Sequence, residues 1–351
     1  MTTLTAPAHL EQDASLRPLP WRRMVWVTWR QHRLALISVA ALLGALAVSL
    51  WIIGLRLRHA YGVAIACHPA SSPACGEALL SFNNLDAVLR NGLVLQALPA
   101  LIGAFVGAPV LARELETGTF RYAWTQGFGR WRWTLAKLVA LAVVLAATTG
   151  ALSVLFSWFY EPYFAPRNPL LSFSQVSPLS GGLFELRGVT FAAWTLAAFA
   201  IGALAGMLVR RVVPAIVATL AVYAGLAFAA GRYLRQHYLT ALITTNQNLP
   251  GSAWIVSQWG TRDGRFAFAG GQYVGGLPTN LLMQLCPYPS VGAKPSVSPA
   301  QCLVQHGYTL WSSYEPGTRF WPFQWIEGGW LLALSALLIG VTVWLVRRRA
   351  T

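Results

Sequence analysis

The sequence predicts an all-α integral membrane protein with six transmembrane helices. Only 11% of its 351 residues are charged, whereas soluble domains carry about a quarter, and the mean hydropathy is +0.51. Six apolar runs are each about 20 residues long, which is the length that a helix needs to cross a bilayer. These runs are Leu34–Leu55, Gly92–Leu111, Leu135–Phe156, Val189–Val209, Val212–Ala230 and Trp325–Val346.

The segment before the first span is basic and amphipathic. Residues 1–20 are polar and broken by Pro18 and Pro20, so we expect a disordered cytoplasmic tail. A helix over residues 21–33 would place Trp21 and Trp29 on an apolar side. The opposite side would carry four arginines, which are Arg22, Arg23, Arg30 and Arg33. This pattern predicts an amphipathic helix in the cytoplasmic membrane interface. The alternative is a plain cytoplasmic extension of the first span.

The distribution of Lys and Arg predicts that both termini are cytoplasmic. In that orientation 15 of the 26 Lys and Arg residues lie on the inner side, as the positive-inside rule expects. These inner residues include the basic tail that follows the last span in the segment 325–351. The net charge of +15 indicates a surface that contacts membrane lipid. Nucleic acid is not an expected partner, because no basic soluble domain is present to bind it.

The long segment 231–324, before the last span, is predicted to be an extracellular domain. Two of its stretches, 239–259 and 265–285, are moderately apolar but broken by Pro, Arg and Gly, so we interpret them as interfacial or re-entrant. All four cysteines fall outside in this topology, on the side where disulfides persist. Pairing within each loop predicts two disulfides, Cys67–Cys75 and Cys286–Cys302. Four unpaired thiols are the alternative, and the absence of a Cys-x-x-Cys spacing disfavours zinc.

The connection between the fourth and fifth spans, within the segment 34–230 that holds the first five spans, is short. Two arginines are almost the whole of it, so we expect these spans to form an antiparallel hairpin.

Small residues in the second and fourth spans predict close helix contacts. Gly-x-x-x-Gly occurs at Gly103 and Gly107 in the second span and at Gly202 and Gly206 in the fourth. This spacing permits close helix contact in lipid. Generic packing is one interpretation, and a dimer interface is the other.

The chain carries no sequence motif of an enzyme. Its only lysines are Lys137 and Lys294, and neither stands in a P-loop, Gly-x-x-x-x-Gly-Lys-Ser/Thr. We therefore expect no catalytic, cofactor or metal site in this chain. The six span cores contain no ionisable residue, with Glu327 at an outer edge and Lys137 near the inner edge, where it can snorkel. Ion-coupled carriers need charges inside the membrane, so the energy for any transport comes from elsewhere.

The cytoplasmic loop 112–134, between the second and third spans, is charged and aromatic. Its marked residues are the carboxylates Glu114 and Glu116, the Gly118-Thr119 break, and the basic residues Arg121 and Arg130. This composition is typical of a docking surface. The alternative is that the carboxylates only cap a short helix. In either case we expect an inner-surface carboxylate to contribute little to the packing of the spans.

This loop resembles the corresponding loop of type-2 permeases of ATP-binding-cassette exporters. The resemblance rests on Glu-x-Glu-x-Gly-Thr at 114–119, on Arg130, and on Lys137 at the start of the next helix. The run Ala-Trp-Thr-Gln at 123–126 is similar to actinobacterial members, and the six-span topology is similar as well. The chain departs from the family at Gly127, where many members have Pro, and in its longer outer loop.

The resemblance implies a multi-pass permease of the bacterial plasma membrane. Such a permease is a homo- or heterodimer that works with separate ATPase subunits, which bind ATP and Mg²⁺. The loop between spans two and three would then contain the coupling helix that sits in a groove of the ATPase. Spans without charges favour an amphipathic or apolar cargo, such as an antibiotic, a lipid or a peptide. The alternative function is a non-transporting membrane sensor or binding module with a regulatory ATPase partner.

Overall fold

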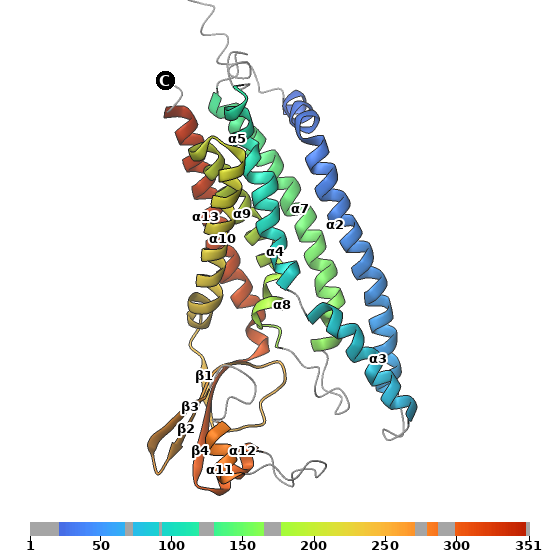
Figure 1. Cartoon of the computed structure of the whole chain (residues 1–351), viewed down its shortest axis with the longest axis vertical. Helices are drawn as coiled ribbons and strands as arrows, with labels where there is room; N and C mark the ends of the chain where they lie inside the picture. Colours follow the sequence, from blue (N-terminus) through green and yellow to red (C-terminus); the bar gives the residue numbers. More distant parts are fainter. Residues whose placement is uncertain are drawn as a thin grey trace, which may run out of the picture.

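The computed structural model describes residues 21–66, 73–90, 93–118, 130–164, 177–270, 279–286 and 299–348 of the chain. Long helices form one bundle, and a small β-sheet with two short helices lies at one end of it (Figure 1). We call this end the sheet end. The opposite end, where the last helix reaches Arg348, is called the tail end.

Within the described residues, six helical stretches are long and apolar enough to cross a membrane, which confirms the six predicted spans. These stretches are Ile37–Ala66, Leu95–Glu116, Trp131–Phe164, Gly188–Val209, Val212–His237 and Gly317–Arg348. Most of them run further than hydropathy indicated. The fifth extends to His237 and the sixth begins at Gly317, so both ends of the segment 231–324 belong to the bundle and not to a separate outer domain.

The helices of the bundle follow one another in chain order. They are α2 (Trp21–Ala66), α3 (Pro73–Arg90), α4 (Leu93–Ile102), α5 (Ala108–Glu116), α7 (Arg130–Phe164), α8 (Gly181–Glu185), α9 (Gly188–Val209), α10 (Val212–Ala229) and α13 (Phe320–Arg348). Short turns of other helix types extend them. These are the π-helical turns η1 (Gly103–Gly107) and η3 (Ala230–Leu234), and the 3-10 turns η4 (Arg235–His237) and η5 (Gly317–Arg319).

Residues 21–33 are helical, as predicted, but they form the first turns of α2 and not a separate helix. α2 continues without a break to Ala66, which agrees with the alternative of an extended first span. The side chains of residues 21–36 lie outside the described part of the chain. The interfacial position of Trp21, Trp29 and the four arginines therefore stays a prediction. The predicted tail 1–20 also lies outside the described residues.

α9 is the central helix of the bundle, where it packs against α4, η1, α5, α7, α10 and α13. Its glycines allow the second span to approach closely. A Cβ added at Gly202 would lie 2.4 Å from Gly103 O, and one at Gly206 would lie 2.4 Å from Ala108 O. A Cβ at Gly107 would lie 2.6 Å from the carbonyl oxygen of Phe199. The two Gly-x-x-x-Gly patterns thus face each other within one chain, which is packing and not a dimer interface.

A regular stripe on α2 explains how the first span joins the bundle. Leu43, Leu50, Leu57 and Ala64 are seven residues apart, and each is no more than 8% exposed. A seven-residue repeat keeps side chains on one helix face. This stripe packs in one cluster with aromatic residues of α7, including Phe156. α2 is therefore fixed along one face, and most of its other described side chains are exposed.

The segment between the fifth and sixth spans contains a four-stranded antiparallel sheet, which the sequence analysis did not predict. The strands are β1 (Leu242–Thr244), β2 (Trp254–Arg262), β3 (Arg265–Gly270) and β4 (Tyr308–Glu315), in the order β1-β4-β2-β3. β2 and β3 form a hairpin with the turn Asp263-Gly264, where both residues have positive φ. Asp-Gly suits such a two-residue turn. For these strands the re-entrant interpretation of 239–259 and 265–285 is therefore wrong, and the interfacial one stays a prediction.

Two short helices, α11 (Thr279–Leu285) and α12 (Pro299–Gln305), complete the sheet domain. The predicted disulfide Cys286–Cys302 joins the end of α11 to α12. Leu303 of α12 packs in one buried cluster with Tyr308 and Leu310 of β4. Cys75 is also disulfide-bonded, and its predicted partner Cys67 lies outside the described residues.

Candidate functional site

The second span ends at the tail end in a glycine with a left-handed backbone. The N–H and the hydroxyl of Thr117 both donate to Arg113 O, at 3.0 and 2.8 Å. Gly118 follows with φ +71°, a conformation that commonly ends helices and favours glycine. Of the other predicted loop residues, Thr119 and Arg121 lie outside the described part of the chain. Arg130 begins α7, and its side chain is not described.

Glu114 is paired with a buried lysine of the next span. Lys137 Nζ donates to Glu114 Oε1 at 2.6 Å and to the carbonyl oxygen of Val110 at 3.1 Å. Lys137 is only 2% exposed, so the prediction that it snorkels is wrong. Its ammonium is held by α5 and does not reach the solvent. Because a buried cation without its carboxylate is costly, this pair fixes the end of α5 against α7.

Glu116 contacts the start of the fifth span. Its Oε2 accepts the backbone N–H of Val212, the first residue of α10, at 3.1 Å. The residue before it, Arg211, has an extended backbone and no capping side-chain bond of its own. A carboxylate at this position satisfies a free helix N–H and lies at the positive end of the helix dipole. Glu116 therefore acts as a cap, but for α10 and not for the helix that carries it.

The hairpin of the fourth and fifth spans is confirmed. α9 ends at Arg210, whose backbone is left-handed with φ 61° and whose N–H donates to Gly206 O at 3.1 Å. α10 begins two residues later at Val212. The sharp turn brings the start of α10 beside the end of α5, where Glu116 reaches it. The end of α5 is thus bonded to two other spans, α7 and α10.

A second polar cluster, which the sequence analysis missed, lies near the sheet end. Arg235 donates to both carboxylate oxygens of Glu327, at 3.0 and 2.8 Å, and to Glu185 Oε1 at 2.7 Å. Trp194 Nε1 and the Tyr238 hydroxyl also donate to Glu327. The side chains of Arg235 and Glu327 are 1% and 0% exposed. The expectation that the span cores contain no ionisable residue is therefore wrong. The fifth span runs past its predicted end at Ala230 and includes Arg235, and Glu327 lies buried inside the sixth span.

This cluster contains two carboxylates and one guanidinium. Glu185 lies in α8, before the fourth span begins at Gly188. Burial raises the pKa of Glu185 above its usual value, and the nearby Arg235 opposes that rise only in part. The bonds of Arg235 join α8, η4 and α13, which are far apart in the sequence. We assign the cluster to the stability of the bundle at the sheet end.

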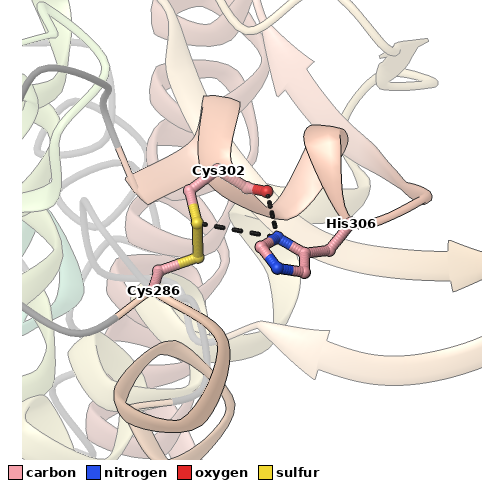
Figure 2. Close-up of side chains that lie close together, drawn as sticks. All are labelled: Cys286, Cys302 and His306. Carbon is pink, nitrogen blue, oxygen red and sulfur yellow. Dashed lines mark hydrogen bonds between the residues drawn. A yellow bond between two sulfur atoms is a disulfide. The ribbon is translucent and has the colours of Figure 1, made fainter.

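Three potential metal ligands converge in the sheet domain. Figure 2 shows His306 directed at Cys302, with Nδ1 at 2.9 Å from the carbonyl oxygen and 3.8 Å from Sγ of that residue. The ligand atoms of His306, Cys302 and Cys286 all lie within 4.8 Å of one another. The two sulfur atoms are bonded to each other (Figure 2), so neither is available as a thiolate ligand. The group is a disulfide with a neighbouring histidine.

The comparisons with known proteins point to one family. The family model described as ABC-2 membrane transporter related matches residues 40–235, which is more than half of the chain. The matched region includes the end of α5, Lys137 and the start of α10. The comparisons with curated proteins and with solved structures gave no match.

Proposed function

The chain belongs to the family of ABC-2 membrane transporter related proteins, and we propose that it is the permease subunit of an ATP-driven exporter. Its six membrane-capable helices support a multi-pass protein. The sequence contains no P-loop, so we infer that ATP and Mg²⁺ are bound by a separate ATPase subunit. We further propose that two permease chains, identical or related, assemble with the ATPase subunits.

The observation that carries this proposal is the pair of contacts made by the end of α5. The proposed ATPase-docking loop, residues 112–134, begins within the last turns of α5. A displacement of the loop would move α5 first, and the Glu114–Lys137 pair would then pass this movement to α7. It would reach α10 through the bond between Glu116 and the Val212 N–H. Coupling requires that such a local displacement changes the arrangement of several packed elements together, and these two contacts provide the connection.

The second span has a local feature that suits a moving element. Between α4 and α5 its backbone forms the π-helical turn η1, and π-turns are frequent at functional sites. This turn contains Gly103 and Gly107, which lie against α9. At these glycines the backbones of η1 and α9 approach each other closely. We propose that the second span shifts along α9 when the docking loop moves.

The proposed cargo is amphipathic or apolar. Large apolar side chains of α10 are exposed along the bundle, including Val213, Val217 and Phe228. Among the described residues, Lys137, Arg235, Glu315 and Glu327 are buried as whole residues, and all four have partners of opposite charge. None of these four therefore offers an isolated charge to a coupling ion. Cargo that partitions into lipid and moves by ATP-driven rearrangement fits this surface.

A sensor is the second candidate function, and the sheet domain is the observation that favours it. The domain is closed by the Cys286–Cys302 disulfide and is attached to the bundle by Ser177 Oγ, which donates to Ser252 O at 2.9 Å. A ligand bound there could signal through α13 without transport.

Reconstitution separates the two functions. The permease and its ATPase would be placed in lipid vesicles with a fluorescent amphipathic cargo. If the chain is an exporter permease, the cargo should move only when both proteins are present and ATP is hydrolysed. ATPase stimulation by the permease without movement of any of a panel of apolar and amphipathic cargoes would favour the sensor.

A further inference from the structure

Arg187 occupies an unusual position at the sheet end. It is the residue directly before α9, with an extended backbone and no capping side-chain bond. Its guanidinium carbon lies 4.2 Å from the ring centre of Phe164 and 4.9 Å from that of Phe320. These rings belong to the end of the third span and the start of the sixth. Arg187 therefore stands where three spans end.

The guanidinium of Arg187 lacks polar partners among the described residues. Its Nε and Nη1 atoms are buried and make no hydrogen bond. A buried N–H without an acceptor costs free energy, and a charged one costs more. The aromatic faces compensate only in part, because a cation over a ring keeps its N–H groups unsatisfied.

Other arginines of the bundle show what Arg187 is missing. Arg235, near the same end, is bound by the carboxylates of Glu327 and Glu185. Arg58 lies over the ring of Trp158, 4.6 Å from its centre, and is paired with Glu161. Arg187 has the aromatic contacts of Arg58 without the carboxylate. Glu185, two residues away in the sequence, is engaged by Arg235.

The charge of Arg187 nevertheless persists at neutral pH. Burial lowers the pKa of its guanidinium to about 10, and nearby Tyr160 has a smaller opposite effect. At pH 7 the group is still protonated and positive. An anion with two acceptor oxygens would satisfy both the charge and the N–H groups of this guanidinium, because the guanidinium presents its N–H groups as a planar pair of donors.

We propose that Arg187 is the core of a phosphate-binding site at the sheet end, and that its ligand is the phosphodiester of a membrane lipid headgroup. A phosphate has paired oxygens that match the guanidinium fork. The flanking Phe164 and Phe320 rings provide apolar walls on which the adjoining acyl chains can lie. The position at the ends of three spans places the site at headgroup depth. This inference does not depend on the proposed exporter activity.

Lipid binding to the delipidated full chain in detergent tests the proposal. Dioctanoyl phosphatidylglycerol would be titrated while the unfolding temperature is recorded, with dioctanoylglycerol as a probe that has the same chains and no phosphate. Inorganic phosphate is the third probe. We expect phosphatidylglycerol to raise the unfolding temperature of the wild-type chain and dioctanoylglycerol to have little effect.

Three variants identify the residue responsible. Arg187→Gln should weaken phosphatidylglycerol binding about tenfold or more, as expected for the loss of charged hydrogen bonds. Arg187→Lys keeps the positive charge but not the planar guanidinium, so we expect a smaller loss of phosphatidylglycerol binding. Arg58→Gln is the matched control, because it removes an arginine that also lies over an aromatic ring, and it should leave binding unchanged. Arg187→Gln removes a charge that has no ion-pair partner, so folding should persist.

The outcomes are distinct. Stabilisation by inorganic phosphate equal to that by phosphatidylglycerol, and lost in Arg187→Gln, would keep the anion site but assign it to a free anion and not to lipid. Equal phosphatidylglycerol affinity of Arg187→Gln and wild type would overturn the proposal. Equal stabilisation by dioctanoylglycerol would overturn it too. If Arg187→Gln does not fold, native mass spectrometry of lipid retained by wild type and Arg187→Lys decides the question.

Discussion

Lys137 Nζ lies 2.6 Å from Glu114 Oε1, and these two residues join the second span to the third at the tail end of the bundle. The lysine side chain is 1% exposed and the glutamate 19%. The ion pair is thus closed to solvent on one side and adjoins the proposed docking loop on the other. Because of this position, the pair holds the second span against the third, and in the proposed mechanism it also transmits a displacement of the docking loop.

Replacement of Glu114 by alanine should strongly destabilise the permease. Lys137 would be left buried with only the carbonyl of Val110 as acceptor, and breaking a buried pair by removing one partner costs about 3–5 kcal/mol. Thermal unfolding in detergent measures this loss. Glu161→Ala is the control, because that carboxylate is 69% exposed and surface pairs contribute about 0–1 kcal/mol. Equal, small effects of both substitutions would show that Lys137 is not held as described.

Replacement of Glu116 by alanine should loosen the start of α10. Loss of a helix cap costs about 0.5–2 kcal/mol, so the global effect should be smaller than that of Glu114→Ala. Hydrogen exchange at the Val212 amide reports the contact directly, and we expect faster exchange in the variant. Glu116→Asp has a shorter side chain, so its carboxylate should restore little of the protection of the Val212 amide. Unchanged protection of Val212 in Glu116→Ala would contradict the cap.

The glycine contact between the second and fourth spans predicts a severe effect of one methyl group. In Gly202→Ala the new Cβ would lie 2.4 Å from the backbone oxygen of Gly103, and such overpacking costs about 1–3 kcal/mol or more. Gly225→Ala in α10 is the matched control, since a Cβ there meets nothing within 4 Å. It should be neutral or slightly stabilising. Similar unfolding temperatures for both variants would mean that α9 and the second span are further apart.

The raised pKa of Glu185 predicts that the free energy of unfolding depends on pH. Its pKa in the folded chain is raised above the ordinary value of 4.5, mainly by burial. The folded state then holds this proton more tightly than the unfolded state. As pH rises from about 4.5 through the raised pKa, the free energy of unfolding should therefore fall. Glu185→Gln lacks this group, so the difference in stability between variant and wild type should change over that range. A constant difference would contradict the raised pKa.

The number and approximate positions of the spans could be predicted because span length and apolar composition are local properties of the sequence. The ends of the spans were less predictable. Arg235 lies beyond the apolar run of the fifth span and Glu327 lies near the start of the run of the sixth, and their mutual pairing across 92 residues is visible only in the folded chain. The same reason hid the role of Lys137, whose charge indicated a snorkelling side chain until its contact with Glu114 was known.

The sheet domain was missed for a different reason. Its strands contain Trp, Arg and Gly and lie in a segment of intermediate hydropathy, so they resembled interrupted membrane segments. The Asp263-Gly264 turn was the available signal, since Asp-Gly between two short strands predicts a hairpin. Of the candidate site, sequence patterns located Glu114 and Glu116 but not their partners, because Lys137 and Val212 reach them only through packing of three spans.

The most direct test of coupling through α5 uses a variant that removes the ion pair without leaving a buried charge. The double substitution Glu114→Leu and Lys137→Met replaces both partners by apolar side chains, which for buried pairs is often neutral or stabilising. The measurement is the stimulation of the partner ATPase by the reconstituted permease, with thermal unfolding and ATPase co-purification as controls. We predict a stable permease that still binds the ATPase but has lost most of the stimulation. Full stimulation by the stable double variant would contradict transmission through this pair.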